Sequence, residues 1–220
     1  MEWSDHWSRD HQNSPHQRFF SFYRKFVFAG GVSYFVNKFF QDEGIFVEPG
    51  SGTSETSVKI DKRGGARMLV AMDLILPVLF TCNDVMDVRL CGDNFHLPFI
   101  DGSINGIWNV GVMEHFTHSE IDVIMKEFYR VLKTGGRIVL LWPGTDSIPQ
   151  KILHMLEKII NIKKRQDKFR FHRIPKEISQ IGSQDEGREI FSRNGFRLLH
   201  YDNGFRTLMA FKILVGEKSS

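Results

Sequence analysis

IFVEPGSGTSE, from Ile45 to Glu55, is the stretch that decides the fold of this chain. Three apolar residues lead into Glu48 and Pro49, and a turn follows in which glycine alternates with serine and threonine. A strand that ends in a glycine-rich turn is typical of a nucleotide site in an open α/β sheet, because ligands bind beyond the carboxyl ends of its strands. The spacing within the turn indicates which nucleotide it suits.

Three kinds of nucleotide turn differ in spacing. A phosphate-binding P-loop requires Gly-x-x-x-x-Gly-Lys, and this chain has no Gly-Lys pair. A dinucleotide turn requires a third glycine at the position of Glu55, which is a poor neighbour for a pyrophosphate. The acidic-x-Gly-x-Gly pattern of Glu48, Gly50 and Gly52 remains, and this turn is the one used for S-adenosylmethionine (SAM).

Length and composition indicate a globular protein with one main core. The chain has 220 residues, 41% of them hydrophobic, and its net charge of +3 is too mild for a protein that coats nucleic acid. Its two cysteines, Cys82 and Cys91, are too few for a disulfide framework and predict a reducing, cytoplasmic location. The polar N-terminus is unlike a signal peptide. The longest uncharged stretch near it, residues 26–37, is shorter than the roughly 20 residues that span a bilayer, so no transmembrane segment is expected.

From Ile45 onwards the chain alternates between strand-like and helix-like periods. Strands are expected at residues 45–48, 67–73, 86–91, 104–110, 137–142, 196–202 and 206–215, and helices at residues 53–62, 74–83, 117–134 and 184–194. Thr117 and Glu120 have the spacing of a capping box, and Gly135-Gly136 would end that helix in a left-handed cap. The alternation predicts an α/β fold, a Rossmann-like doubly wound sheet that is mostly parallel and has helices on both faces.

The connection between the last two strands, residues 203–205, is too short for a parallel crossover. The sheet is therefore expected to have one antiparallel edge strand.

Four stretches resemble class I SAM-dependent methyltransferases in order and spacing: VEPGSGTSE, VAMDL, GDNFHLPFIDGSINGIWNVGVMEHF and EFYRVLKTGGRIVLLWP. The resemblance covers residues 45–143 and, more weakly, residues 195–215. It is nearest to small-molecule methyltransferases similar to those of ubiquinone and menaquinone biosynthesis, which have the methyltransferase type 11 domain. LPFIDGS and VLKTGGR are its most specific pieces, because they are long and correctly placed.

The resemblance implies that the first two strands of this region end at SAM. Glu48, Gly50, Gly52 and Thr53 would hold the methionine end of SAM. Asp73 ends the second strand, where a carboxylate can accept hydrogen bonds from both ribose hydroxyls.

The resemblance also implies that residues at the ends of the second, third and fourth strands make the remaining contacts with SAM. Leu74 would pack on the adenine, Asp93 would accept the adenine amino hydrogens, and the backbone N–H of Asn94 would meet a ring nitrogen. Val110 and Gly111 would line the methyl-donor pocket.

Three positions depart from the pattern of the family. Ser54 stands where a third glycine is usual, Ile104 where phenylalanine is frequent, and Asn105 where aspartate is usual. Ser54 lies in the cofactor turn itself. Ile104 and Asn105 are interpreted as sequence drift at the surface or in the core, without a functional role.

Glu114 and His115 follow the fourth strand, where the chemistry on the acceptor is expected. Histidine is a natural general base near neutral pH, so both residues are candidate catalytic groups. A structural role, with the imidazole fixing the loop, is the alternative. His115-x-x-His118 is not interpreted as a metal site, because no third ligand lies nearby in the sequence.

The N-terminal segment, residues 1–42, holds 12 of the 28 aromatic residues. A helix whose phenylalanine face covers the sheet is one interpretation, and Gly30-Gly31 would split it into two helices. A lid over the substrate or SAM is the second, and a membrane-surface helix, given the neighbouring Arg18, Arg24, Lys25 and Lys38, is the third. A combination of core and lid is favoured, with residues 43–220 forming the SAM-binding domain.

Residues 149–180 form a basic insertion between the fifth strand and the last helix. They hold nine Lys and Arg against three Asp and Glu, a net charge of +6. A solvated helix face would explain this charge. A cleft that attracts an anionic acceptor is the functional hypothesis.

The sequence thus predicts a SAM-dependent methyltransferase that acts on an oxygen, nitrogen or carbon nucleophile of a small molecule. The acceptor is expected to be anionic with an apolar part, and no nucleic acid is expected, because NVGVMEHF stands where amino-methylating enzymes of nucleic acids usually have a [DNS]-P-P-[YFW] motif. A SAM-binding module without catalysis remains an alternative. The sequence does not indicate the acceptor atom or the oligomeric state.

Overall fold

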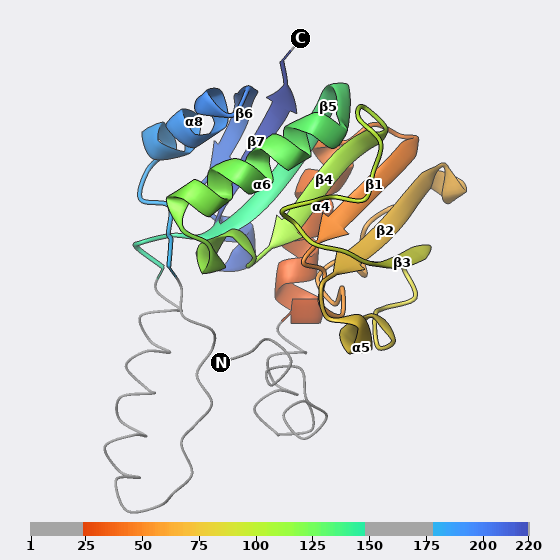
Figure 1. Ribbon diagram of the computed structural model, residues 1–220. Coiled ribbons are helices and arrows are strands. Elements are labelled where there is room, and N and C mark those ends of the chain that lie inside the picture. Colours follow the sequence, from red (N-terminus) through yellow and green to blue (C-terminus); the bar gives the residue numbers. More distant parts are fainter. Residues whose placement is uncertain (1–23, 148–177, 220) are drawn as a thin grey trace, which may run out of the picture.

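A computed structural model describes residues 24–147 and 178–219 of the chain (Figure 1). Seven strands form one sheet in the order β3-β2-β1-β4-β5-β7-β6. The first five strands in this order pair in parallel, whereas β7 is antiparallel to both of its neighbours. The predicted fold class, a mostly parallel doubly wound sheet with one antiparallel strand towards its edge, is confirmed, and this strand, β7, lies between β5 and the edge strand β6.

The strands have the following bounds: β1 Gly44–Pro49, β2 Arg67–Asp73, β3 Val88–Cys91, β4 Ile104–Val110, β5 Leu132–Pro143, β6 Phe196–Asp202 and β7 Phe211–Lys218. The helices are η1 Arg24–Phe28, α4 Ala29–Phe39, η2 Arg63–Gly65, α5 Leu76–Leu79, η3 Met113–His115, α6 His118–Val131, α8 Gln184–Arg193 and η4 Phe205–Thr207. The predicted strands 67–73, 104–110 and 196–202 have exactly the expected bounds.

Helices cover both faces of the sheet, so the core has two layers (Figure 1). On one face, α6 and α8 bury side chains such as Ile121, Phe128 and Phe191 against alternate residues of β1, β4 and β5. On the other face, α4 buries Val32, Phe35 and Val36 against the intervening residues. Burial on both faces explains why the central strands are apolar without strict alternation. Within the described residues, no helix combines the length and apolar character that crossing a bilayer requires.

The start of α6 agrees with the prediction, whereas its end does not. The capping box of α6 is present, since Thr117 and the Glu120 side chain bond reciprocally. The helix ends earlier than expected, however, because Leu132 already has extended backbone angles and belongs to β5. Gly135 is left-handed (φ +73°) but lies beyond the helix, so the predicted glycine cap is wrong.

Gly30-Gly31 does not split the N-terminal helical segment, contrary to the prediction. Both glycines lie inside α4, which continues directly from η1. A Cβ on Gly31 would come within 2.8 Å of Thr207 Cγ2, so this glycine is needed for the close approach of α4 to η4. The phenylalanine face of α4 does cover the sheet, as expected.

Arg67 is the first residue of β2, at the amino-terminal edge of the sheet, and its side chain is fully buried. Its guanidinium donates to the backbone oxygens of Gln41, Phe40 and Asp61 at 2.8, 2.9 and 3.1 Å, and to Asn37 Oδ1 at 2.9 Å. All three of its nitrogens therefore have acceptors, as a buried cation requires.

Candidate functional site

The turn after β1 depends on two glycines with left-handed backbone angles. Gly50 has φ +72° and Gly52 has φ +52°. A Cβ on Gly50 would lie 2.9 Å from both methyl carbons of Val112, so a side chain there would collide with the segment after β4. The turn is thereby held against the end of β4 at close range.

The segment after the turn is not the helix that the sequence predicts. Residues 53–62 form successive turns instead, with hydrogen bonds from Ser54 N to Ser51 O, Ser57 N to Ser54 O and Ile60 N to Ser57 O. Ser54, at the position where a third glycine is usual in the family that the turn resembles, has φ +52°, a left-handed conformation that glycine adopts more readily. Serine and threonine favour turns over helices because their hydroxyls bond locally, which explains the wrong prediction.

Glu48 lies buried beneath these turns at the end of β1. Its Oε1 accepts hydrogen bonds from Ser57 Oγ at 2.9 Å and Thr56 Oγ1 at 3.4 Å. Trp108 Nε1 in turn donates to Ser57 Oγ at 3.0 Å. The other carboxylate oxygen of Glu48, Oε2, is buried and has no hydrogen-bond partner among the described residues. Burial raises the pKa of Glu48 to about 7, although the hydroxyl hydrogen bonds act in the opposite direction.

Asp73 joins the turn after β1 to the end of β2. Its Oδ2 accepts from Gly52 N at 2.8 Å and its Oδ1 accepts from Ile75 N at 2.9 Å. The carboxylate is largely buried by these contacts, but each oxygen has a further lone pair to offer. Leu74, which follows it, is mostly exposed, and Thr53 is half-buried with its carbonyl bonded to Asn83 N.

Asp93 follows the end of β3, next to Asp73. Gly92 N donates to the backbone oxygen of Asp73 at 3.1 Å, which sets the two strand ends side by side. Asp93 Oδ1 accepts from Phe95 N at 3.0 Å, and this bond fixes the turn that contains Asn94. Asp93 and Asn94 are both half-buried.

The end of β4 brings Val110 and Gly111 to the Glu114–His115 turn. Gly111 has φ +67°, and a Cβ there would lie 3.1 Å from Glu114 Oε1. Glu114 is buried, and its Oε1 lies 3.8 Å from His115 Nε2. The structure therefore brings both catalytic candidates to the same strand end as the methyl-donor candidates.

A segment distant in sequence fixes this turn in place. Ile178 N and Ser179 N both donate to the carbonyl of Glu114, at 2.6 and 3.1 Å, and Ser179 Oγ donates to Met113 O at 3.1 Å. Trp142 Nε1 donates to Ser179 O at 3.4 Å. Sequence reasoning missed Ser179, because these contacts are non-local and leave no periodic signal.

Asn109 is a second residue that the sequence did not single out. It is fully buried on β4, and neither atom of its side-chain amide has a hydrogen-bond partner among the described residues. Ser57, Thr56 and Trp108 were also missed, although the density of hydroxyl residues after Glu48 is a signal that could have indicated them.

The comparisons with known proteins agree with this geometry. Residues 47–140 match the family described as a methyltransferase domain. A protein of Encephalitozoon cuniculi, named a "putative methyltransferase", is 30% identical over 115 residues, which are 51% of this chain and 51% of that protein. The chain thus matches about half the length of this curated relative.

Two solved structures show the same fold at low sequence identity. A SAM-dependent methyltransferase of Thermotoga maritima is 18% identical with a TM-score of 0.62, and the match covers 93% of this chain and 94% of that one. The geranyl diphosphate C-methyltransferase of Streptomyces coelicolor, solved with S-adenosyl-L-homocysteine, is 14% identical with a TM-score of 0.57, over 86% and 75% of the two chains. The chain accordingly shares its fold with these solved methyltransferases, and its residues 47–140 match the methyltransferase-domain family.

Proposed function

We propose that the chain is a SAM-dependent methyltransferase that methylates an oxygen, nitrogen or carbon atom of a small molecule. One observation carries the proposal: Gly52 N donates to Asp73 Oδ2 at 2.8 Å. This bond joins the acidic-x-Gly-x-Gly turn to the acidic end of the neighbouring strand. Both lie beyond the carboxyl ends of parallel strands, where open α/β sheets bind their ligands.

The described residues fit the chemistry of SAM. Glu48 Oε2 is a buried acceptor without a partner among them, and the amino group at the methionine end of SAM is a donor that would satisfy it. Gly50 and Gly52 give the turn the left-handed backbone angles that its tight path requires. Asp73 would hold the ribose, and Asp93, Asn94 and Leu74 would surround the adenine.

SAM supplies a methyl group on a positively charged sulfur, which is already activated for transfer. The chain would therefore mainly orient the reactants and exclude water. Val110 and Gly111 would line the transfer pocket. Where the acceptor arrives protonated, His115, beside Glu114, is the candidate general base, and the alternative is that its imidazole only fixes the turn.

Calorimetry on the purified chain tests the binding step. SAM and S-adenosylhomocysteine should bind, whereas NAD and ATP should not. A folded sample that does not bind SAM would contradict the proposal. Release of S-adenosylhomocysteine in a metabolite screen then separates an enzyme from a SAM-binding module without catalysis.

The nature of the acceptor is a finer part of the proposal. The acceptor would be anionic, attracted by the basic insertion at residues 149–180, and residues 1–42 would cover its apolar part. Most of these two segments, residues 1–23 and 148–177, lies outside the described residues. A kinship with quinone-biosynthesis methyltransferases and a cytoplasmic location, with Cys82 and Cys91 as free thiols, belong to the same proposal.

Replacement of Lys163, Lys164 and Arg165 by Ala tests the charge hypothesis once an acceptor is identified. The KM of the acceptor should rise at low ionic strength, and the difference from the unmodified chain should shrink as salt screens the charges. SAM affinity should stay constant. A KM that responds neither to the substitution nor to salt would indicate a solvated helix face.

A further inference from the structure

Large apolar side chains reach solvent where η1, α4 and η4 pack together. The exposed fraction is 74% for Phe205, 57% for Leu208, 58% for Phe26 and 37% for Tyr34. These four residues are named the apolar rim here. The elements form one continuous surface, because Gly31 approaches Thr207 closely and the Arg206 guanidinium lies 3.7 Å from the centre of the Tyr34 ring.

The rim includes one stripe of α4. Gly30, Tyr34 and Lys38 are four residues apart, which places them on one side of the helix. The side chains of Val32, Phe35 and Val36 point the other way, into the core. A Cβ on Gly30 would meet no atom within 4 Å, so this position lies open on the surface.

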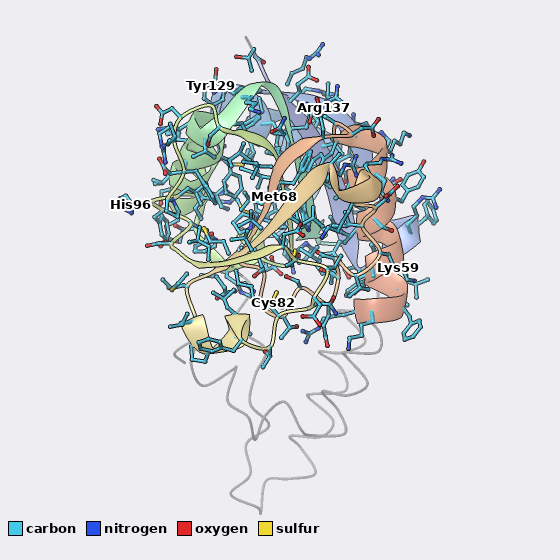
Figure 2. All side chains as sticks on the ribbon, turned by 90° about the vertical axis from the view of Figure 1, so that its right-hand side faces the viewer. Lys59, Met68, Cys82, His96, Tyr129 and Arg137 are labelled. Atoms are coloured by element: carbon cyan, nitrogen blue, oxygen red, sulfur yellow. The ribbon has the colours of Figure 1, made fainter. Side chains whose placement is uncertain are left out.

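Cations accompany the aromatic rings of the rim. Lys38 Nζ lies 5.5 Å from the centre of the Tyr34 ring, and Lys59 Nζ lies 5.7 Å from that of Phe26. Figure 2 shows Lys59 beside α4. Within the described part of the chain, Lys38, Lys59 and Arg206 form no ion pair.

Arg24 and Lys25 lie close to the same surface but are offset by an acidic side chain. Glu55 lies 3.9 Å from Arg24 and 3.4 Å from Lys25. The positive charge of the rim therefore comes mainly from Lys38, Lys59 and Arg206.

We propose that the apolar rim rests on an anionic lipid surface. Aromatic rings beside basic side chains are the composition that favours the headgroup region, where the rings meet the acyl boundary and the cations meet phosphates. The three cations beside these rings complement the negative charge of anionic headgroups. This charge complementarity favours a lipid surface over a protein partner.

This contact would orient the candidate site. β6 runs parallel to β1, since both β5 and β6 are antiparallel to β7. The segment after β6, with Phe205 and Leu208, therefore lies at the same edge of the sheet as the turn after Glu48. The lipid contact would bring this edge to the membrane, whatever reaction the site performs.

Co-sedimentation of the full chain with vesicles tests the proposal. Vesicles of phosphatidylcholine with added phosphatidylserine should bind the chain more tightly than phosphatidylcholine alone, and salt should weaken the binding. Gly30→Glu should weaken it about fivefold and Gly30→Lys should tighten it about fivefold, given the usual worth of one charge at such a surface. Gly30→Ala should change little.

Val123→Glu is the matched control for Gly30→Glu. Val123 is an exposed residue of α6, on the opposite face of the sheet, so a glutamate there should leave vesicle binding unchanged. Leu208→Asn combined with Phe205→Ser removes apolar surface and should weaken binding at least about tenfold. Leu208 has φ +51°, a conformation that asparagine tolerates well, so the double variant should fold.

Two results with vesicles would overturn the proposal. One is an unmodified chain whose vesicle binding does not depend on phosphatidylserine, and the other is equal binding by the Gly30→Glu and Val123→Glu variants. Sedimentation velocity without lipid covers the remaining case: if the chain self-associates and Gly30→Glu abolishes this, the rim is a contact between copies and the lipid proposal fails.

Discussion

Arg67 and Glu48 are buried charged side chains on neighbouring strands, at opposite edges of the sheet. Arg67 begins β2 at the amino-terminal edge, and Glu48 lies at the carboxyl end of β1. The three guanidinium nitrogens of Arg67 all have acceptors. One carboxylate oxygen of Glu48 accepts two hydroxyls, whereas the other has no partner among the described residues.

The difference is the one expected between a buried charge that stabilises the fold and one that is proposed to hold a ligand. A buried charge whose hydrogen bonds are all made within the protein holds segments together and has nothing left for a ligand. A buried acceptor left open costs stability, and such a cost is expected where a ligand is to bind. The following predictions test this comparison, from the largest expected effect to the smallest.

Arg67→Met should lower the free energy of unfolding by about 3–5 kcal/mol, because it leaves the carbonyls of Phe40, Gln41 and Asp61 without their donor. Urea denaturation measures this effect. The exposed Arg188→Met, on α8, is a matched control that should change stability little. If Arg67→Met changes the free energy of unfolding by less than about 1 kcal/mol, Arg67 contributes no more than an ordinary surface contact. The contrast with Glu48 would then not hold.

Glu48→Gln should remove a pH dependence of stability. The folded pKa of about 7 lies above the ordinary value of 4.5, so the contribution of Glu48 is fully present below pH 4.5 and is lost as the pH rises to 7. The loss amounts to roughly 3 kcal/mol. Urea denaturation of both proteins at several pH values gives the difference. Parallel pH profiles for the two proteins would show that the Glu48 carboxyl is not perturbed by burial.

Asp73→Ala should weaken SAM binding by roughly 1–3 kcal/mol, the scale of charge-assisted hydrogen bonds lost from a buried site. Asp73→Asn is the sharper control, because its amide oxygen still accepts from one backbone N–H. Asp93→Asn should cost less than Asp73→Ala, since the amide oxygen can still accept from adenine. Calorimetry that finds equal affinity in Asp73→Ala and the unmodified chain would contradict the assignment.

Ser57→Ala should destabilise the fold by about 1 kcal/mol, because it removes the hydroxyl between Glu48 and Trp108. The folded pKa of Glu48 should rise further, since a hydrogen bond that favours its charged form is lost. Trp108→Phe removes the indole donor to Ser57, and with it part of a buried ring, but keeps the Ser57–Glu48 contact, so it separates the two contacts. A pKa of Glu48 that is unchanged in Ser57→Ala would show that the hydroxyl does not act on the carboxylate.

His115→Ala should leave SAM affinity nearly unchanged, because His115 is not among the residues proposed to hold SAM. We also expect a small change in turnover, since the turn is held chiefly through the Glu114 carbonyl. A fall in turnover of about 10²–10⁴-fold would instead assign His115 as a general base.

Most strands could be located because they are apolar runs that end at a carboxylate or are followed by glycine. RMLVAMD and INGIWNV gave exact bounds for this reason. The segment 53–62 could not be predicted, because its hydroxyls bond to Glu48 and stabilise turns that a helical period does not reveal. Asn105 was interpreted as drift, yet its Oδ1 accepts from Ile45 N and links β4 to β1.

The candidate site was predictable only where a strand end carries a residue of distinct chemistry. Glu48, Asp73 and Asp93 stand out in this way. Ser179 and Asn109 do not, because their significance comes from contacts and burial that arise only in the folded chain.

The two points where residues 148–177 leave and rejoin the domain lie next to each other. Thr145 N bonds to Ile181 O at 3.2 Å, and Ile181 N bonds to Pro143 O at 3.0 Å. Because the junction is closed by the domain itself, doubling the length of the connecting segment would cost only about 0.6 kcal/mol of loop entropy. Exchange of the segment between Ser147 and Ile178 is thus expected to leave the sheet and the turn after Glu48 intact.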